Sequence, residues 1–333
     1  MSKAEGDPAA VYEALREEAG RVLIGNEEVL ERITIAALTG GHVLLEGVPG
    51  VAKTTIANLF ARATGLDFTR VQMTPDILPA DITGSHIYRE NVGEFELNKG
   101  PVFANVVVAD EINRATPKTQ SALLEAMQEQ TVTIEGETLA LPDPFTVIAT
   151  QNPIEMEGVF ELPEAQRDRF QFKLTVDLPD RPVERELLDR FDADPGLGPG
   201  QTERVIDEQD LIAAREAVGE VHVASPVKEY ILDVVRATRT SEDVEYGASP
   251  RATLAFLNAG KARAAIRGRE YVIPDDVKSL AMPILVHRLV LSTEAELGEE
   301  STERVIERIL DQTAVPADAG ESTPDLATGA GDD

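Results

Sequence analysis

The chain carries its clearest motif at residues 47–54, which read Gly47-Val48-Pro49-Gly50-Val51-Ala52-Lys53-Thr54. An apolar run at residues 42–46 comes just before it and predicts a β-strand. Apolar side chains at helical spacing follow it, beginning with Ile56 and Leu59. A strand, a glycine-rich loop, a Lys-Thr pair and a helix in this order form the P-loop arrangement, which binds nucleoside triphosphates.

The residue types in this loop suit phosphate binding. Gly47 and Gly50 allow the backbone to curl so that its N–H groups point inward. The start of the following helix adds roughly half a positive charge. Lys53 can reach the β- and γ-phosphates, and the Thr54 hydroxyl can ligate Mg²⁺. With Thr55, residues 47–55 form the predicted nucleotide-binding set.

One position departs from the usual motif. Ala52 stands where most P-loops have glycine before the Lys-Thr pair. We expect this position to open the helix with ordinary helical dihedral angles, which an alanine adopts without strain. The phosphate cradle is therefore expected to survive the substitution.

Composition limits the classes of protein that the chain can belong to. Its 333 residues are enough for two domains. It has no cysteine, which excludes disulfides and thiolate zinc sites. The first residues are polar and acidic, unlike a signal peptide, and no apolar run is long enough to span a bilayer. We expect a soluble cytoplasmic protein.

The charge balance is strongly acidic. Asp and Glu number 60 against 31 Lys and Arg, a net charge of −29. A duplex-binding module normally has a basic face, so the balance argues against nucleic acid as a partner. An acidic chain with few lysines resembles the proteins of salt-accumulating cells, so a halophilic protein is one hypothesis. The alternative is a charged surface that only confers solubility.

The order of predicted elements indicates an α/β fold. Further strands are predicted at residues 68–72, 106–111, 145–150 and 170–176, with helices between them. This alternation predicts a parallel, doubly wound sheet covered by helices on both faces.

We predict four segments along the chain. The sheet domain covers residues 1–180, and it carries a helix-and-hairpin insertion at 74–100 and a hairpin at 131–141. We predict a linker at residues 181–206, a helical domain at 207–313 and a disordered tail at 314–333.

Two further strands end in residues suited to phosphate chemistry. Asp110 and Glu111 close the run at 106–109, and Asn152 follows the next strand. The carboxyl ends of parallel strands meet the P-loop, so these side chains should face the phosphates. Asp110 can hold Mg²⁺, Glu111 can polarise the attacking water, and Asn152 can orient that water.

Three arginines are candidates for stabilising charge on the phosphates. Arg169 precedes the last predicted strand and is our choice for an arginine finger supplied by a neighbouring subunit, with Arg167 as the alternative. Arg251 opens a helix of the C-terminal part, where Ser249 is a plausible cap. Arg251 can reach the γ-phosphate of its own subunit or of a neighbour.

Together these motifs resemble the MoxR family of AAA+ ATPases over nearly the whole chain, to about Val315. Besides residues 47–54, the matching stretches are 109–115, 117–127, 149–153, 162–166, 168–170 and 247–252. The resemblance implies an AAA+ αβα domain followed by a small helical lid. It assigns Walker A to 47–54, Walker B to 106–111, sensor 1 to Asn152, the finger to Arg169 and sensor 2 to Arg251. Ala52 fits this family.

The resemblance also implies an activity and partners. Members use ATP and Mg²⁺, usually form hexameric homo-oligomeric rings, and remodel or mature client proteins. They often work with a protein that bears a von Willebrand factor A domain. Three alternatives stay open: a DNA-linked AAA+ motor, the AAA+ subunit of a metal chelatase, and a scaffold that binds ATP without turnover.

Overall fold

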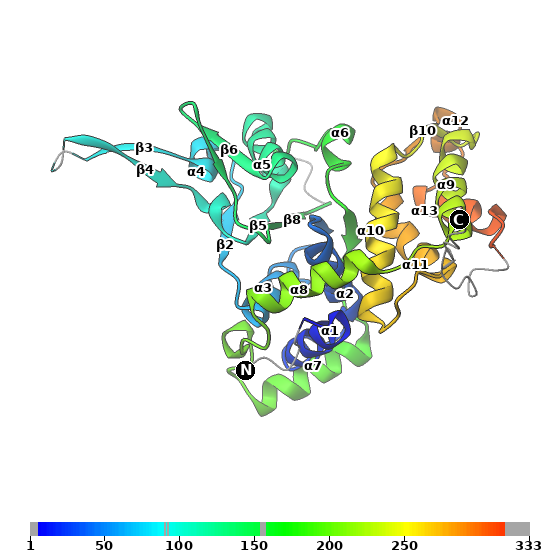
Figure 1. Ribbon diagram of the computed structural model, residues 1–333, viewed down its shortest axis with the longest axis horizontal. Coiled ribbons are helices and arrows are strands. Elements are labelled where there is room, and N and C mark those ends of the chain that lie inside the picture. The colour runs from blue at the N-terminus through cyan, green and yellow to red at the C-terminus, as the bar shows by residue number, and fades with distance from the viewer. Residues whose placement is uncertain (1–5, 90, 92, 154–157, 317–333) are drawn as a thin grey trace, which may run out of the picture.

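The computed structural model describes residues 6–89, 91, 93–153 and 158–316. Its centre is a five-stranded parallel sheet in the order β2-β5-β8-β1-β9, of which Figure 1 labels β2, β5 and β8. The strands are β1 Val43–Glu46, β2 Phe68–Gln72, β5 Val106–Asp110, β8 Thr146–Gln151 and β9 Phe172–Thr175. Each lies where the sequence predicts one, so the parallel α/β prediction is confirmed.

The sheet is buried on both faces. In β1, Val43 and Leu45 belong to one apolar core and Leu44 belongs to the other. The same alternation divides β5, where Val106 and Val107 point into opposite cores. Successive side chains of a strand point to opposite faces, so strands covered on both sides are apolar throughout. This explains the continuous apolar runs in the sequence.

Helices form a layer on each face of the sheet (Figure 1). The core that contains Val43 also contains side chains of α1 Pro8–Ala19, α2 Glu27–Thr39, α3 Lys53–Thr64 and α8 Glu208–Glu220, together with side chains of helices further along the chain. The opposite core contains side chains of α5 Pro117–Glu129.

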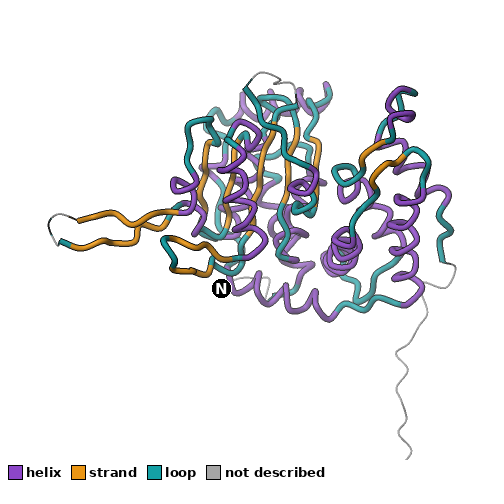
Figure 2. Tube along the Cα trace, turned by 90° about the horizontal axis from the view of Figure 1, so that it is seen from above, coloured by secondary structure: helices purple, strands orange, loops and turns teal. Residues whose placement is uncertain are grey.

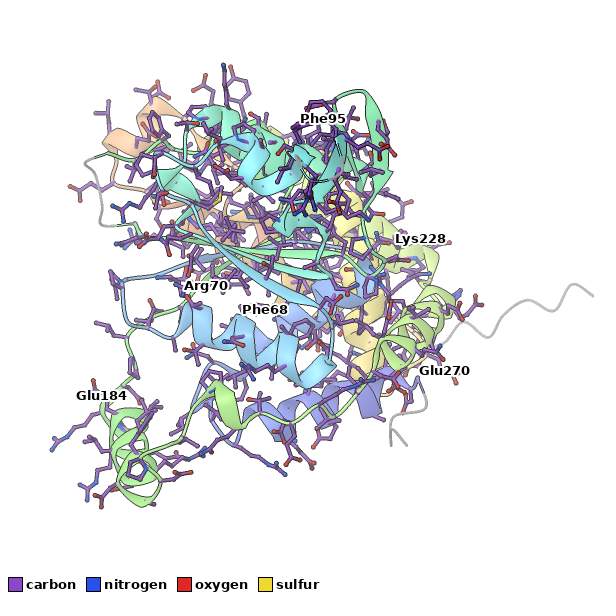
Figure 3. The ribbon with its side chains drawn as sticks, turned by 90° about the vertical axis from the view of Figure 1, so that its left-hand side faces the viewer. Phe68, Arg70, Phe95, Glu184, Lys228 and Glu270 are labelled. Carbon is purple, nitrogen blue, oxygen red and sulfur yellow. The ribbon has the colours of Figure 1, made fainter. Side chains whose placement is uncertain are left out.

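Two antiparallel hairpins leave the sheet domain. The first consists of β3 Gly84–Arg89 and β4 Glu94–Lys99, and it follows the short helix α4 Pro79–Thr83. It extends away from the sheet domain in Figure 2 and carries the exposed Phe95 that is labelled in Figure 3. The second consists of β6 Thr131–Ile134 and β7 Glu137–Ala140.

The C-terminal part is mainly helical. Its helices are α7 Arg181–Ala193, α9 Ser225–Thr240, α10 Pro250–Ile266, α11 Pro274–Leu285, α12 Thr293–Leu297 and α13 Thr302–Gln312. The remaining short elements of the described chain are η1 Pro101–Phe103, η2 Ile112–Arg114, α6 Glu164–Arg167, η3 Pro199–Gln201, β10 Val244–Tyr246 and β11 Val290–Leu291.

Helix α8 packs against α1 and α2 although it lies within the predicted helical domain 207–313. The predicted domain boundaries therefore stay a prediction. The predicted disordered tail 314–333 lies outside the described residues beyond residue 316. In the described part of the chain, no helix combines the length and apolar character that crossing a membrane requires.

A buried histidine joins three parts of the sheet domain. His42, only 4% exposed, precedes β1. Its Nδ1 accepts a hydrogen bond from the Val147 N–H at 3.0 Å, so its Nε2 carries the proton and donates to the Met127 carbonyl at 3.1 Å. Burial lowers the pKa of His42 to about 4, because the charged ring would lose its hydration.

We predict that His42 makes the fold sensitive to acid. The pKa of His42 is lower in the folded chain than in the unfolded chain, so the unfolded state binds the extra proton. Stability is therefore complete above about pH 6.5 and falls by up to about 3 kcal/mol as the pH drops towards 4. In urea unfolding across this range, the His42→Gln variant should lose less stability than the wild type. Parallel stability curves for the two proteins would contradict this assignment.

Candidate active site

The loop at residues 47–54 connects β1 to α3 and requires both of its glycines. A side chain at Gly47 would place its Cβ 2.4 Å from the Val176 carbonyl oxygen. Gly50 has a φ of +90°, a conformation that residues with a Cβ rarely adopt. The two glycines thus satisfy different requirements, close backbone approach at one and left-handed backbone at the other.

The conformation expected for Ala52 is wrong. Ala52 precedes α3 with φ 64° and ψ 18°, in the left-handed region, and the helix begins at Lys53. A Cβ in this region approaches the following carbonyl oxygen, which costs roughly 1–2 kcal/mol. The usual glycine at this position avoids that cost. The loop thus has a left-handed residue before the helix although that residue is an alanine.

Lys53 lies at the first position of α3 and turns back over the loop. Its Nζ donates to the Val48 carbonyl at 2.9 Å and also to the Gly47 carbonyl. Burial lowers the pKa of Lys53, while the charges of Asp110 and Glu111 act in the opposite direction. The ammonium group is therefore already held within the loop that it would share with phosphates.

The Asp110 carboxylate is the meeting point of several elements. Its Oδ1 accepts hydrogen bonds from the Thr54 hydroxyl at 3.0 Å and the Thr150 hydroxyl at 2.9 Å. Its Oδ2 accepts from Arg70 Nε at 2.6 Å. Asp110 is only 4% exposed, so these donors compensate the lost hydration of its charge.

Glu111 follows Asp110 with a strained backbone and a restrained side chain. Its φ is 56°, in the left-handed region, and its N–H donates to the Thr150 hydroxyl at 3.0 Å. Its Oε2 accepts from Gln72 Nε2 at 2.6 Å and from Arg114 Nη1 at 3.0 Å. Such strain is often found at functional sites, where the surrounding structure maintains it.

These side chains border one cavity of about 380 Å³ at the carboxyl edge of the sheet. The predicted residues that line it are Pro49, Gly50, Val51, Ala52, Lys53, Thr54, Thr55, Asp110, Glu111 and Asn152. Gly47 and Val48 lie behind this surface and present their carbonyl groups to Lys53. The structure thus brings the P-loop, both acids and Asn152 together.

The donor set fits a nucleoside triphosphate with Mg²⁺. Phosphates need N–H groups and a cation, which the loop and Lys53 supply. Mg²⁺ prefers oxygen ligands and keeps several waters, so it needs few groups from the protein. The Thr54 hydroxyl and the Asp110 carboxylate, 3.0 Å apart, are two such groups.

Sequence reasoning missed two residues on β2. Arg70 and Gln72 line the cavity and bind the side chains of Asp110 and Glu111 (Figure 3 labels Arg70). The register pairs Gln72 with Asp110 directly across the two strands. Their position at the end of β2, beside the strand that ends in Asp110, could have indicated them. Using that position required knowledge of the strand order.

Comparisons with known proteins agree with this geometry. Residues 42–172 match the family model described as ATPase family associated with various cellular activities (AAA), and residues 236–309 match an AAA lid domain. Chaperone MoxR1 of Mycobacterium tuberculosis is 47% identical over 94% of this chain and 85% of its own length. The chain belongs to the MoxR family of AAA+ ATPases. The fold is accordingly an AAA+ αβα domain followed by a helical lid domain.

Two other relatives cover the chain as fully. Uncharacterized protein YeaC of Bacillus subtilis is 45% identical over 90% of this chain and 93% of its own. A solved structure from Cytophaga hutchinsonii, whose description assigns it only provisionally as an ATPase, has a TM-score of 0.86 and 40% identity. It covers 93% of this chain and 96% of that one.

None of the three predicted arginines of this MoxR-family chain, Arg167, Arg169 and Arg251, lines the P-loop cavity. Arg169 and Arg251 border a second cavity of about 240 Å³, together with Arg288. Arg169 Nη1 donates to the Leu124 carbonyl at 2.7 Å, and Arg251 Nη2 donates to Gln128 Oε1 at 3.2 Å. The structure therefore brings Arg169 and Arg251 to each other and not to Lys53.

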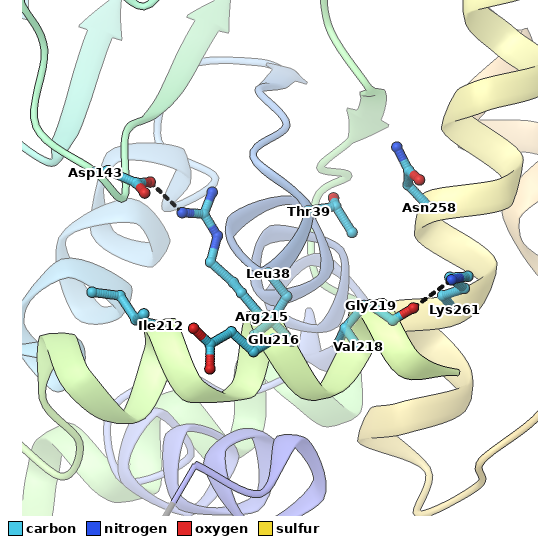
Figure 4. A pocket seen from close by; sticks show the side chains of 10 residues that line it. All are labelled: Leu38, Thr39, Asp143, Ile212, Arg215, Glu216, Val218, Gly219, Asn258 and Lys261. Carbon is cyan, nitrogen blue, oxygen red and sulfur yellow. Dashed lines mark hydrogen bonds and ion pairs between the residues drawn. The ribbon is translucent and has the colours of Figure 1, made fainter. Parts of the chain in front are cut away.

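A third cavity, of about 480 Å³, lies between α2, α8 and α10 (Figure 4). Arg215 of α8 pairs with Asp143 at 2.5 Å, and Lys261 of α10 donates to the Gly219 carbonyl at 2.6 Å. These contacts join α8 to the loop before β8 and to α10. None of the predicted site residues, all of which are in described ranges, lines this cavity.

We predict that Ala52→Gly raises the free energy of unfolding by roughly 0.5–1 kcal/mol. The replacement removes the cost of a left-handed alanine, which raises stability by about 1–2 kcal/mol. It also raises the entropy of the unfolded chain, which lowers stability by about 0.5–1 kcal/mol. The measurement is denaturant unfolding without nucleotide.

Ala57→Gly is the matched control, because Ala57 lies inside α3. There the same replacement should lower stability by at least about 1 kcal/mol, because it weakens the helix and also removes a buried Cβ. A loss of stability for Ala52→Gly as well would show that residue 52 is not left-handed.

Proposed function

We propose that this MoxR-family protein hydrolyses ATP and uses the energy to remodel or mature client proteins. The observation that carries the proposal is the meeting of the P-loop, Asp110, Glu111 and Asn152 at one cavity. A scaffold that only binds nucleotide would have no need of an acid and an amide beside the phosphates.

Each residue at the cavity has a role in the proposed reaction. The loop N–H groups and Lys53 bind the phosphates, and Thr54 and Asp110 hold Mg²⁺, which supplies positive charge when bound. Glu111 accepts the proton of the attacking water, and Asn152 orients that water. Gln72 and Arg114 restrain the Glu111 carboxylate until the water is in place.

The proposed assembly is a homo-oligomeric, hexameric ring. Arg169 and Arg251 share a cavity that is separate from the P-loop cavity of the same chain. In a head-to-tail ring, one surface of a subunit meets a different surface of the next. This arrangement supports Arg169 as a finger for the neighbour's nucleotide, and it favours a role in trans for Arg251. Arg169 is preferred to Arg167 because Arg169 lines this cavity.

The proposal extends to location and partners. A cytoplasmic location is proposed because that compartment supplies ATP, and the proposed partners are client proteins and a protein bearing a von Willebrand factor A domain. The net charge of −29 weighs against a nucleic-acid substrate. Proteins retained by a Glu111→Gln variant loaded with ATP would identify the client.

We predict that Glu111→Gln binds ATP but lowers turnover by about 10²–10⁴-fold, the usual contribution of a positioned base. Lys53→Ala should lose ATP binding, because it removes the cation of the phosphate cradle. Phosphate release and nucleotide binding measure the two effects. Glu184→Gln, at an exposed position of α7, is the matched control and should turn over normally. Normal hydrolysis by Glu111→Gln would refute the mechanism.

We also predict that two inactive variants restore activity when mixed. Glu111→Gln has an intact finger and Arg169→Ala has an intact cavity, so roughly a quarter of the interfaces in random mixed rings would join both intact parts. ATP hydrolysis by the mixture, compared with each variant alone, is the measurement. If sizing shows mixed rings but activity stays absent, Arg169 does not act in trans. Repeating the mixture with Arg167→Ala tests the other arginine.

A further inference from the structure

The short segment around Arg169 is held by the lid domain. Residues 168–171 precede β9, whereas the groups that bind them come from the N-terminus of α10 and from the residues after α11. Ser249 lies 81 residues from Asp168 in the chain, and Arg288 lies 120 residues from it. The contacts therefore belong to the interface between the sheet domain and the lid.

Arg288 makes most of these contacts. Its side chain is only 3% exposed, and its Nε donates to Asp168 Oδ1 at 2.8 Å. Its Nη2 donates to the Phe170 carbonyl at 2.6 Å and its Nη1 to the Gln171 carbonyl at 3.2 Å. The planar guanidinium thus binds the chain on both sides of Arg169, which a point charge such as Lys cannot do.

The second oxygen of Asp168 connects the same segment to the helix that carries Arg251. Ser249 Oγ donates to Asp168 Oδ2 at 2.9 Å and accepts the Arg251 N–H at 3.1 Å. His287 Nε2 lies 3.0 Å from the Phe170 carbonyl and donates to it. Asp168 therefore joins the end of α11 to the start of α10 beside Arg169.

Arg169 itself has weaker restraints within the described structure. Its Nη1 donates to the Leu124 carbonyl at 2.7 Å, and its Nε is buried without a hydrogen-bond partner. The direction of its side chain therefore depends on the backbone at 168–171. The ion pair resists separation, because the buried Arg288 charge would remain without solvent or partner. When the lid moves, this segment should move with it.

We propose that Arg288, acting through Asp168 and the carbonyl groups of 170 and 171, is a positioning residue for Arg169. The lid then sets the position of the group that completes the neighbour's active site. The inference rests on the proposed ATPase function and on the role of Arg169 as a finger. Arg288 touches no nucleotide in this scheme and acts only through the segment that it holds.

Arg288→Lys is the variant that tests the inference. Lysine keeps the charge opposite Asp168 but cannot also bind both carbonyl groups. We expect kcat to fall about 10–100-fold, since a misplacement of about 1 Å costs up to 10²-fold. Nucleotide affinity should stay unchanged because the P-loop cavity of the same subunit is intact. Weaker nucleotide binding with unchanged kcat would overturn the proposal.

Mixing experiments separate positioning from a general loss of structure. Arg288→Lys mixed with Glu111→Gln should regain activity, since the second variant supplies an intact finger. Arg288→Lys mixed with Arg169→Ala should show no gain, because both lack a working finger. Gain in both mixtures, or in neither, refutes the inference, provided that Glu111→Gln with Arg169→Ala does complement. Failure of that reference pair would instead show that Arg169 does not act in trans, which removes the premise of the inference and leaves the proposed ATPase activity standing.

Arg32→Gln is the matched control. Arg32 is also 3% exposed, pairs with Glu31 at 2.9 Å and donates to the Ser279 carbonyl of α11 at 3.0 Å, but it does not contact 168–171. It should lower thermal stability without lowering kcat of the folded protein. If it lowers kcat as much as Arg288→Lys does, the effect comes from loosening the lid in general.

Discussion

The hydrogen bonds at Asp110 are the constraint on which the rest of the site depends. Strand β5 lies between β2 and β8, so a side chain at its carboxyl end reaches residues from both neighbours. Asp110 receives Arg70 from β2, Thr150 from β8 and Thr54 from α3. A buried carboxylate requires such donors, and they in turn fix the start of α3 against the sheet. The Thr54 hydrogen bond therefore connects the start of α3, and with it the P-loop, to the strand that leads to Glu111.

The same sheet separates the two groups of proposed site residues. The P-loop cavity lies at the carboxyl ends of its central strands, whereas Arg169 lies before β9, at the amino end of the edge strand. Because the sheet is rigid, these two sites stay at opposite ends of its strands. A subunit with a phosphate-binding loop at one end of its strands and arginines at the other is suited to repeated head-to-tail contact.

Local sequence patterns made the fold and the candidate residues at the P-loop cavity predictable. Apolar runs indicated β1, β5 and β8, and Asp110, Glu111 and Asn152 were chosen as candidates because they lie just after such runs. Arg70 and Gln72 were missed because they lie on a half-exposed strand, where a polar residue is ordinary. Arg288 was missed because it is 120 residues from Asp168 in sequence. The prediction for Ala52 was wrong because the residue type alone does not indicate a left-handed backbone.

The segment that carries Arg169 is also connected to the P-loop of its own subunit. It continues directly into β9, which pairs with β1 along its whole length. Just after β9, the Val176 N–H donates to the Glu46 carbonyl at 2.7 Å, and the Val176 carbonyl leaves no room for a side chain at Gly47. Packed strands move as units because interiors are dense. The sheet therefore holds β9 in register with the strand before the P-loop, so a displacement that the lid applies to 168–171 leaves the P-loop of the same subunit in place.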